Sequence, residues 1–366
     1  MPKNPTSLHW MICVPMSTDT VTYKRRIADA MSDILKANPE AVIIGQGVAD
    51  PTAIFGTTEG LARDYGHARV IDTAIMEEGM TGIAIGMALN GLYPIQTHIR
   101  VDFLIVAMNQ LVNMAAKYRY MYGNSFEVPM LIRAVVGRSW GQGPQHSQSL
   151  QSLFAHIPVL TVIMPASAQS AYESYRYAAT KLKNPVISIE HRLLYDLTFK
   201  ADSHEEHDGN PFAARLVQHG QDVTIVATSY MVQEAQRAAE WVKRHANIDC
   251  EIIDLHTVSN INPDKILQSV KKTGRILIAD TSWQAYGVSA EICRLIMERD
   301  PGLLREPAIT LGMAATPCPT SHSLEDVFYS DMPDIVASVY KLMRREGVTP
   351  TKSEAKDMRK SFKGPF

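Results

Sequence analysis

Residues 72–87 read DTAIMEEGMTGIAIGM and decide the fold, because they join a buried strand to a helix that carries both acidic residues and glycines. Glu77 and Glu78 stand in the first helical turn, where the helix dipole favours negative charge. Ligands of open α/β sheets bind at such junctions, at the carboxyl ends of the strands. Glycine inside a helix costs ~1 kcal/mol relative to alanine. Gly82 and Gly86 share one helical face, so we expect close helix packing there, across a subunit boundary.

Short apolar runs alternate with longer helical patterns on both sides of this stretch. Such alternation is typical of parallel sheets covered on both faces. We therefore predict an α/β protein with two doubly wound domains and mainly parallel sheets. The expected segments are an N-terminal extension (1–20), a first domain (21–200), a polar linker (201–214), a second domain (215–346) and a basic tail (347–366). The expected strands are 41–45, 69–72, 129–137, 160–164 and 185–190 in the first domain, and 222–228, 249–255, 275–280 and 308–312 in the second.

Composition excludes several functional classes. The 366 residues include 36 Lys plus Arg and 38 Asp plus Glu, and this near balance argues against a nucleic-acid binder. No apolar run reaches the ~18 residues that a membrane-spanning helix needs. The four cysteines are scattered without a CxxC pair, which predicts neither disulfides nor a zinc site and favours a reducing cytoplasm. We read no signal peptide at the start of the chain.

The spacing Glu77, four residues, Gly82-Ile83, two residues, Gly86-Met87 resembles the pyrimidine-side motif of thiamine diphosphate enzymes. The surrounding matches run in order along residues 22–344, and the chain resembles the β subunit of the 2-oxoacid dehydrogenase decarboxylating component, of the pyruvate or branched-chain type. They are Phe103 after PIQTHIRVD, Arg133 in LIRAVVG, the run QHSQ at 145–148, IIDLHTVSNINPD at 252–264 and TSWQAYGVSAEI at 281–292. The resemblance implies a transketolase-like pyrimidine-binding domain followed by a transketolase C-terminal-like domain that serves assembly.

This resemblance assigns roles to individual residues. Glu77, rather than Glu78, would hydrogen-bond the pyrimidine ring nitrogen of thiamine diphosphate and favour the tautomer that activates the cofactor. Gly82 belongs to the same cofactor-binding motif, and Phe103 would stack on the pyrimidine ring. His146 would face the reaction intermediate and the incoming lipoyl group, as a general acid or base.

The resemblance also implies a monovalent cation, potassium, held by backbone carbonyls. The matching positions are Met130, Ala178, Ala179 and Asn184. Here the segment TKLKNP has one extra residue and places Lys181 and Lys183 where an acidic residue is common.

One half of the expected site is missing from the sequence. The family's diphosphate clamp is a Gly-Asp-Gly motif with a downstream Asn, which together hold Mg²⁺, and no GDG occurs in this chain. No GxxxxGK[ST] phosphate loop occurs either. By resemblance, an α-type subunit carrying the GDG motif supplies this half in an α2β2 assembly, and a lipoyl acyltransferase component is a further partner.

Several positions depart from the family pattern. Gln46 stands in Gly45-Gln46-Gly47-Val48, where acidic residues are usual. His98 and Arg100 lie before Phe103, and a cation there suits recognition of a substrate carboxylate or phosphate. Pairing of Arg100 with an acid of the partner subunit is an equal alternative. Trp140, in the loop before His146, is a third candidate for shaping the substrate pocket.

Three functions therefore stay open. The first is decarboxylation of a small 2-oxoacid with transfer of the acyl group to a lipoyl domain. The second is a related thiamine diphosphate-dependent carboligase or split transketolase of a biosynthetic pathway, which the changes at Gln46, His98 and Arg100 favour. The third, a non-catalytic scaffold subunit, predicts loss of Glu77 or His146, and both residues are present.

Overall fold

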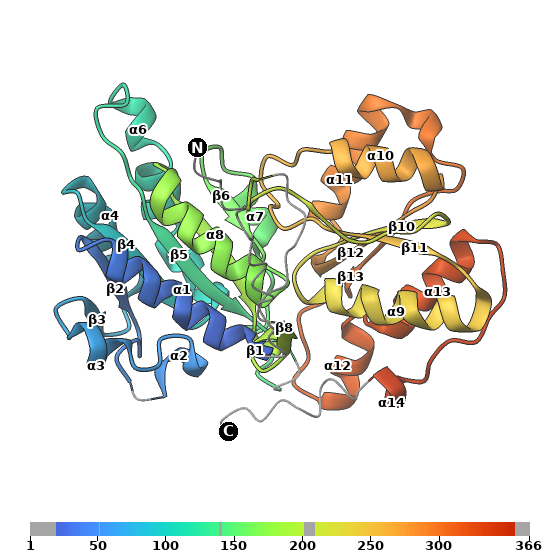
Figure 1. Ribbon diagram of the computed structural model, residues 1–366, viewed down its shortest axis with the longest axis horizontal. Helices are drawn as coiled ribbons and strands as arrows, with labels where there is room; N and C mark the ends of the chain where they lie inside the picture. The colour runs from blue at the N-terminus through green and yellow to red at the C-terminus, as the bar shows by residue number, and fades with distance from the viewer. Residues whose placement is uncertain (1–19, 51, 139–140, 201–208, 356–366) are drawn as a thin grey trace, which may run out of the picture.

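The chain folds around two β-sheets (Figure 1), in a computed structural model that describes residues 20–50, 52–138, 141–200 and 209–355. The first sheet has six strands, all parallel, in the order β3-β2-β4-β5-β7-β6. The second has five strands in the order β13-β12-β10-β11-β9, and β9 alone runs antiparallel, beside β11. The predicted α/β class with mainly parallel sheets is confirmed.

The elements follow one another in a regular alternation. The first sheet comprises β2 (Ala41–Gly45), β3 (Val70–Asp72), β4 (Tyr93–His98), β5 (Leu131–Val136), β6 (Thr161–Ile163) and β7 (Val186–His191). Its helices are α1 (Tyr23–Ala37), α2 (Ala53–Gly56), α3 (Leu61–Tyr65), α4 (Glu77–Leu89), α5 (Val101–Leu104), η1 (Ile105–Ala107), η2 (Gln110–Ala115), α6 (Tyr118–Met121), α7 (Gln151–Ala155), α8 (Ala168–Lys181) and η3 (Arg192–Leu194). A two-stranded ribbon of β1 (Thr20–Thr22) and β8 (Thr198–Lys200) joins the two ends of this unit.

The second sheet comprises β9 (Arg215–Gln218), β10 (Val223–Ala227), β11 (Cys250–Asp254), β12 (Ile276–Trp283) and β13 (Ile309–Met313). Its helices are α9 (Tyr230–Ala246), α10 (Asp264–Thr273), α11 (Val288–Arg299), η4 (Pro301–Leu303), α12 (His322–Phe328), α13 (Met332–Leu342) and α14 (Lys352–Ala355).

Strand β5 shows why the first sheet is buried on both faces. Side chains alternate across a strand, and Ile132 and Ala134 belong to one hydrophobic core while Leu131 and Val135 belong to another. Helices α1 and α8 pack together over the second of these cores. Arg133, which lies between Leu131 and Val135 in β5, forms a buried ion pair with Glu190. Every β5 position is therefore buried, which explains its continuous apolar run.

The two units share a core and a polar seam. The hydrophobic cluster that contains Ile132 of the first sheet continues into Val226 and Ile253 of the second. Beside it, the Gln151 Nε2 atom donates to Asp280 Oδ1 at 2.8 Å. The two units are consequently packed against each other through both apolar and polar contacts.

The apolar stretch 103–120 does not form one continuous helix. It forms α5, the 3₁₀ turn η1, the π-helix η2 and the short α6. A π-helix is rare and often lies at a functional site. Here η2 begins with Gln110, whose side chain reaches the start of α4.

The chain continues beyond α13 and packs against α9. Trp241 Nε1 donates to the Val348 carbonyl oxygen at 2.7 Å, Arg237 donates to the Ala355 carbonyl, and Ala355 is buried. The predicted N-terminal extension, most of the linker and residues 356–366 of the tail lie outside the described residues. In the part that is described, no helix is long and apolar enough to cross a membrane.

Candidate functional site

Glu77 and Gln46 meet at the carboxyl edge of the first sheet. Strands β2 and β3 are parallel neighbours with Gly45 opposite Asp72, so the segments that follow them lie side by side. Gln46 is buried, and its Nε2 atom donates to Glu77 Oε1 at 3.2 Å. Glu77 is half-buried, and no second partner of its carboxylate is found in the described residues. One oxygen is thus oriented by an amide while the other is left for a ligand.

Glu78, the neighbouring acid, is directed elsewhere. Its Oε1 atom accepts a hydrogen bond of 2.9 Å from Gln110 Nε2, and its side chain is exposed. Because Glu78 is tied to η2 and Glu77 faces the loop after β2, the two adjacent carboxylates occupy different environments.

One face of α4 is open and apolar. Cβ atoms built at Gly82 and Gly86 would meet no atom of the described chain within 4 Å. Ile83, between them, is 46% exposed, and Ile75 just before the helix is 83% exposed. A helix that is apolar around its whole circumference is normally buried on all sides. The expected packing of this face is therefore not made within the described part of the chain.

The structure brings Phe103 and His146 together. Phe103 lies in α5, directly after β4, and His146 lies in the loop that follows β5. Their rings meet edge to face, with centroids 5.2 Å apart and an interplanar angle of 75°. Both side chains are partly exposed. Since β2, β3, β4 and β5 are neighbours in the sheet, Glu77, Phe103 and His146 all gather at one sheet edge.

The two basic candidates near Phe103 have different environments. His98 is 1% exposed, neither ring nitrogen has a hydrogen-bond partner among the described residues, and burial lowers its pKa to about 3. A neutral, enclosed imidazole has no charge with which to attract an anion. Burial also lowers the pKa of Arg100, to about 10, which leaves the guanidinium charged at neutral pH. Arg100 Nη2 donates to Gln142 Oε1 at 2.6 Å.

Of the predicted cation positions, Met130 and Asn184 lie just before β5 and β7, and Ala178 and Ala179 lie in the last turn of α8. The Met130 carbonyl accepts a hydrogen bond from Val186 N, and the Ala178 carbonyl accepts one from Leu182 N at the end of α8. The Asn184 side chain accepts from Arg119. A carbonyl oxygen has two lone pairs, so these bonds leave the potassium prediction open. Trp140, the third pocket candidate, lies outside the described residues.

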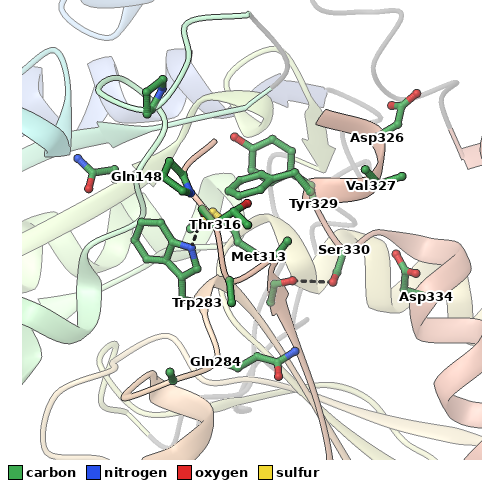
Figure 2. A pocket seen from close by; sticks show the side chains of 17 residues that line it. Gln148, Trp283, Gln284, Met313, Thr316, Asp326, Val327, Tyr329, Ser330 and Asp334 are labelled. Carbon is green, nitrogen blue, oxygen red and sulfur yellow. Dashed lines mark hydrogen bonds between the residues drawn. The ribbon is translucent and has the colours of Figure 1, made fainter. Parts of the chain in front are cut away.

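The described residues hold no group of three or more His, Cys, Asp or Glu side chains arranged to bind a metal ion. A groove of about 990 Å³ does lie beside the His146 loop. Figure 2 shows Gln148 on one side of it, Trp283 nearby, and Asp326 with Val327 on the other side. Most residues that line this groove, which adjoins the candidate site, therefore belong to the second unit.

Family models match both halves of the chain. The pyrimidine-binding domain of transketolase matches residues 19–198, and the transketolase C-terminal domain matches residues 213–335. The β subunit of the pyruvate dehydrogenase E1 component of Rickettsia felis is 34% identical over 88% of this chain and 98% of that protein. The chain belongs to the family of pyruvate dehydrogenase E1 β subunits.

Members of this E1 β family from distant organisms are similarly close. The mitochondrial β subunit of Saccharomyces cerevisiae is 32% identical over 90% of this chain and 91% of its own length, and that of Bos taurus is 33% identical over 88% and 90%. A solved structure, a split gene transketolase described as an inactive β4 tetramer, has a TM-score of 0.72 at 20% identity and covers 88% of this chain and 98% of its own. The family resemblance expected from the sequence is confirmed.

The E1 β family depends on thiamine diphosphate, and the site has features that fit this cofactor's pyrimidine ring. Glu77 offers an unshared carboxylate oxygen, Phe103 offers a partly exposed ring, and the surface over Gly82 is open. The sequence did not predict the contact of Gln46 with Glu77 or the hydrogen bonds that Asp102 accepts from Gln148. Asp102 directly precedes Phe103, so its place in the sequence was an available signal, whereas the contact of Gln46 with Glu77 joins residues 31 apart.

Proposed function

We propose that this chain is the β subunit of a heteromeric thiamine diphosphate-dependent 2-oxoacid dehydrogenase. With an α-type partner it decarboxylates a small 2-oxoacid of the pyruvate or branched-chain type and transfers the acyl group to a lipoyl domain. The observation that carries the proposal is that Glu77, Phe103 and His146 each follow a parallel strand and so lie at the carboxyl edge of the first sheet, where the Phe103 and His146 rings are in contact. Membership of the E1 β family supports the class of reaction.

Thiamine diphosphate supplies an electron sink for the carbon that loses carbon dioxide. With the cofactor bound, the Glu77 carboxyl group would hydrogen-bond the pyrimidine ring nitrogen, and the Gln46 amide would fix the orientation of that carboxyl group. Phe103 would stack an apolar ring face on the pyrimidine and leave the polar ring edge to Glu77. These residues bind and orient one half of the cofactor.

His146 serves as the general acid or base toward the substrate and the acyl acceptor. Imidazole suits this work near neutral pH, and a partly exposed ring in a loop can meet a group entering from outside. Arg100, charged and hydrogen-bonded to the same loop, is the better of the two basic candidates for binding the substrate carboxylate. His98 is too deeply enclosed to bind it by charge.

The α-type partner supplies what this sequence lacks. The chain has no GDG motif, so the partner holds the diphosphate and Mg²⁺ and completes the site. The open apolar face of α4, at the same sheet edge as Glu77, is a surface that such a partner would cover. The lipoyl acyltransferase component is the second expected partner, and potassium on the carbonyls near Met130 stays a prediction.

The competing function is a carboligase or split transketolase that passes the activated group to a carbonyl acceptor. A buried, charged Arg100 beside the His146 loop favours it, because such a cation suits a phosphate-bearing acceptor. A scaffold role finds less support, since it predicts loss of Glu77 or His146 and both residues are present at the carboxyl edge of the first sheet.

Two assays on one preparation separate these functions. The complex is purified through a tag on this chain and supplied with thiamine diphosphate, Mg²⁺ and a 2-oxoacid. Acyl transfer to a dihydrolipoyl domain and carbon–carbon ligation to an aldehyde are then measured in parallel. We expect acyl transfer to dominate. Ligation without acyl transfer would establish the carboligase. Absence of both acyl transfer and ligation would support the scaffold.

A further inference from the structure

Asp102 is bonded to the segment that carries His146 and has no role in the proposed chemistry. It immediately precedes Phe103 in α5, and its side chain is 3% exposed. Its Oδ1 atom accepts two hydrogen bonds from one residue, from the Gln148 backbone N at 3.0 Å and from Gln148 Nε2 at 3.1 Å. Asp102 thus connects the segment that carries Phe103 to the QHSQ run that carries His146.

The residues around His146 are held on both sides, whereas the imidazole is not. Gln142 accepts from Arg100, and Gly141 N donates to Glu325 of the second unit. Beyond His146, Ser149 is bound to Thr281 and Ser282 of the second unit. In the described residues His146 itself has only the edge-to-face contact with Phe103 and no side-chain hydrogen bond. The direction of its ring is therefore set by the backbone of the turn.

The hydrogen bonds of Asp102 to Gln148 connect the turn that carries His146 to α5 of the first unit. Gln148 is two residues from His146, and a buried backbone N–H that loses its acceptor is costly. Gln148 also lines the groove of Figure 2, so its side chain stands between this groove and Asp102. Burial raises the pKa of Asp102, and the two bonds from Gln148 oppose that shift.

We propose that Asp102 is a positioning residue for His146, which by accepting both hydrogen bonds from Gln148 fixes the QHSQ turn and the approach of the imidazole to the Phe103 ring. This inference rests on the proposed function of His146. It concerns the acceptor atom Oδ1 and not the negative charge. The second oxygen, Oδ2, has no hydrogen-bond partner among the described residues, so asparagine retains the only atom that the tether uses.

Replacement of Asp102 discriminates between positioning and charge. In Asp102→Ala both Gln148 donors lose their acceptor and the turn relaxes. Misplacement of a catalytic group by about 1 Å costs on the order of 10²-fold in rate. We expect kcat to fall by about ten- to a hundredfold with little change in the KM for the 2-oxoacid. Asp102→Asn keeps the acceptor and should restore kcat to within about threefold of the wild type.

The experiment uses the tagged complex in three forms: wild type, Asp102→Ala and Asp102→Asn. Steady-state kinetics are paired with hydrogen–deuterium exchange of the peptide that covers residues 141–150, which reports the Gln148 amide directly. Glu251→Ala is the matched control, because Glu251 is a buried carboxylate that accepts the Gly220 backbone N–H far from the site. We expect faster exchange of the peptide in Asp102→Ala alone, and a wild-type kcat in Glu251→Ala.

Two results would overturn the proposal: unchanged exchange and kcat in Asp102→Ala, or an equal loss of kcat in Asp102→Asn, which would mean that the charge is what matters. The exchange measurement does not depend on the reaction. If the wild-type complex fails to decarboxylate any 2-oxoacid, the proposed function fails, while the exchange data still decide whether Asp102 holds the turn.

Discussion

At the scale of single residues, two adjacent carboxylates differ in their hydrogen-bond partners. Glu77 receives an amide from Gln46 after β2, and Glu78 receives one from Gln110 in η2. The sequence assigns the cofactor contact to Glu77 only by resemblance. The structure adds a difference between the two acids, because Glu77 is half-buried beside the loop after β2 while Glu78 is exposed and bound to η2. Gln46, a departure from the family pattern, thus acquires a specific contact.

His98 gives a residue-scale prediction about pH. Its folded pKa is about 3, and an unfolded histidine has a pKa of about 6.5. Between these values the unfolded chain binds a proton that the folded chain does not, so the free energy of unfolding decreases as the pH falls below about 6.5. His98→Gln removes this contribution. Between pH 6 and pH 5, we expect the free energy of unfolding of the variant to fall by about 1 kcal/mol less per pH unit than that of the wild type.

Urea unfolding at several pH values checks this expectation. The exposed His67→Gln serves as the control and should keep the wild-type slope. Parallel slopes for His98→Gln and the wild type would mean that His98 does not remain neutral in the folded chain.

At the scale of elements, the loop after β5 is shaped by the second unit. Gly143 has a φ of +71°, and a Cβ atom there would lie 2.6 Å from Thr320 Cγ2. Gly143→Ala combines a left-handed backbone with this close contact, so we expect a loss of about 1–3 kcal/mol in stability together with reduced kcat. Gly123→Ala is the matched control, since Gly123 has a φ of +58° and open space around it.

Thermal melting and activity of both glycine variants provide the measurement. The control should lose stability through backbone strain alone and keep its kcat. A Gly143→Ala protein that behaves as the control does would show that the second unit does not shape the His146 loop.

The strands and helices were largely predictable, and the loop contacts were not. Buried runs such as 41–45 and 223–227 are apolar because both sheet faces are covered, so their composition reports their environment. In the stretch 103–120 the apolar residues continue while the helix winding changes at η2, so the sequence pattern does not show where one helical segment ends and the next begins. The contact of Gly141 with Glu325 spans 184 residues, and no local pattern encodes such a pairing.

At the scale of the whole molecule, the open face of α4 is the clearest sign that the chain acts with a partner. Asp at position 83 would place a charge in a surface that the proposal assigns to the α-type subunit. We expect Ile83→Asp to fold but to lose most of its assembly, because an unpaired charge buried in an interface is costly. Light scattering of the purified protein measures the assembled mass.

Val348→Asp is the control for this change. Val348 is 65% exposed and lies beside α9, away from the α4 face. This variant should assemble as the wild type does. Full assembly of Ile83→Asp would show that the α4 face is not the partner's binding surface.

The central claim, that this chain contributes the pyrimidine half of a thiamine diphosphate site, is tested most directly by decarboxylation in the tagged complex with Glu77→Gln. Glu78→Gln is the matched control at the neighbouring position. We predict that Glu77→Gln lowers thiamine diphosphate-dependent release of carbon dioxide from a 2-oxoacid by about 10²–10⁴-fold. Glu78→Gln should remain close to the wild type. Retention of wild-type decarboxylation by Glu77→Gln would contradict the account.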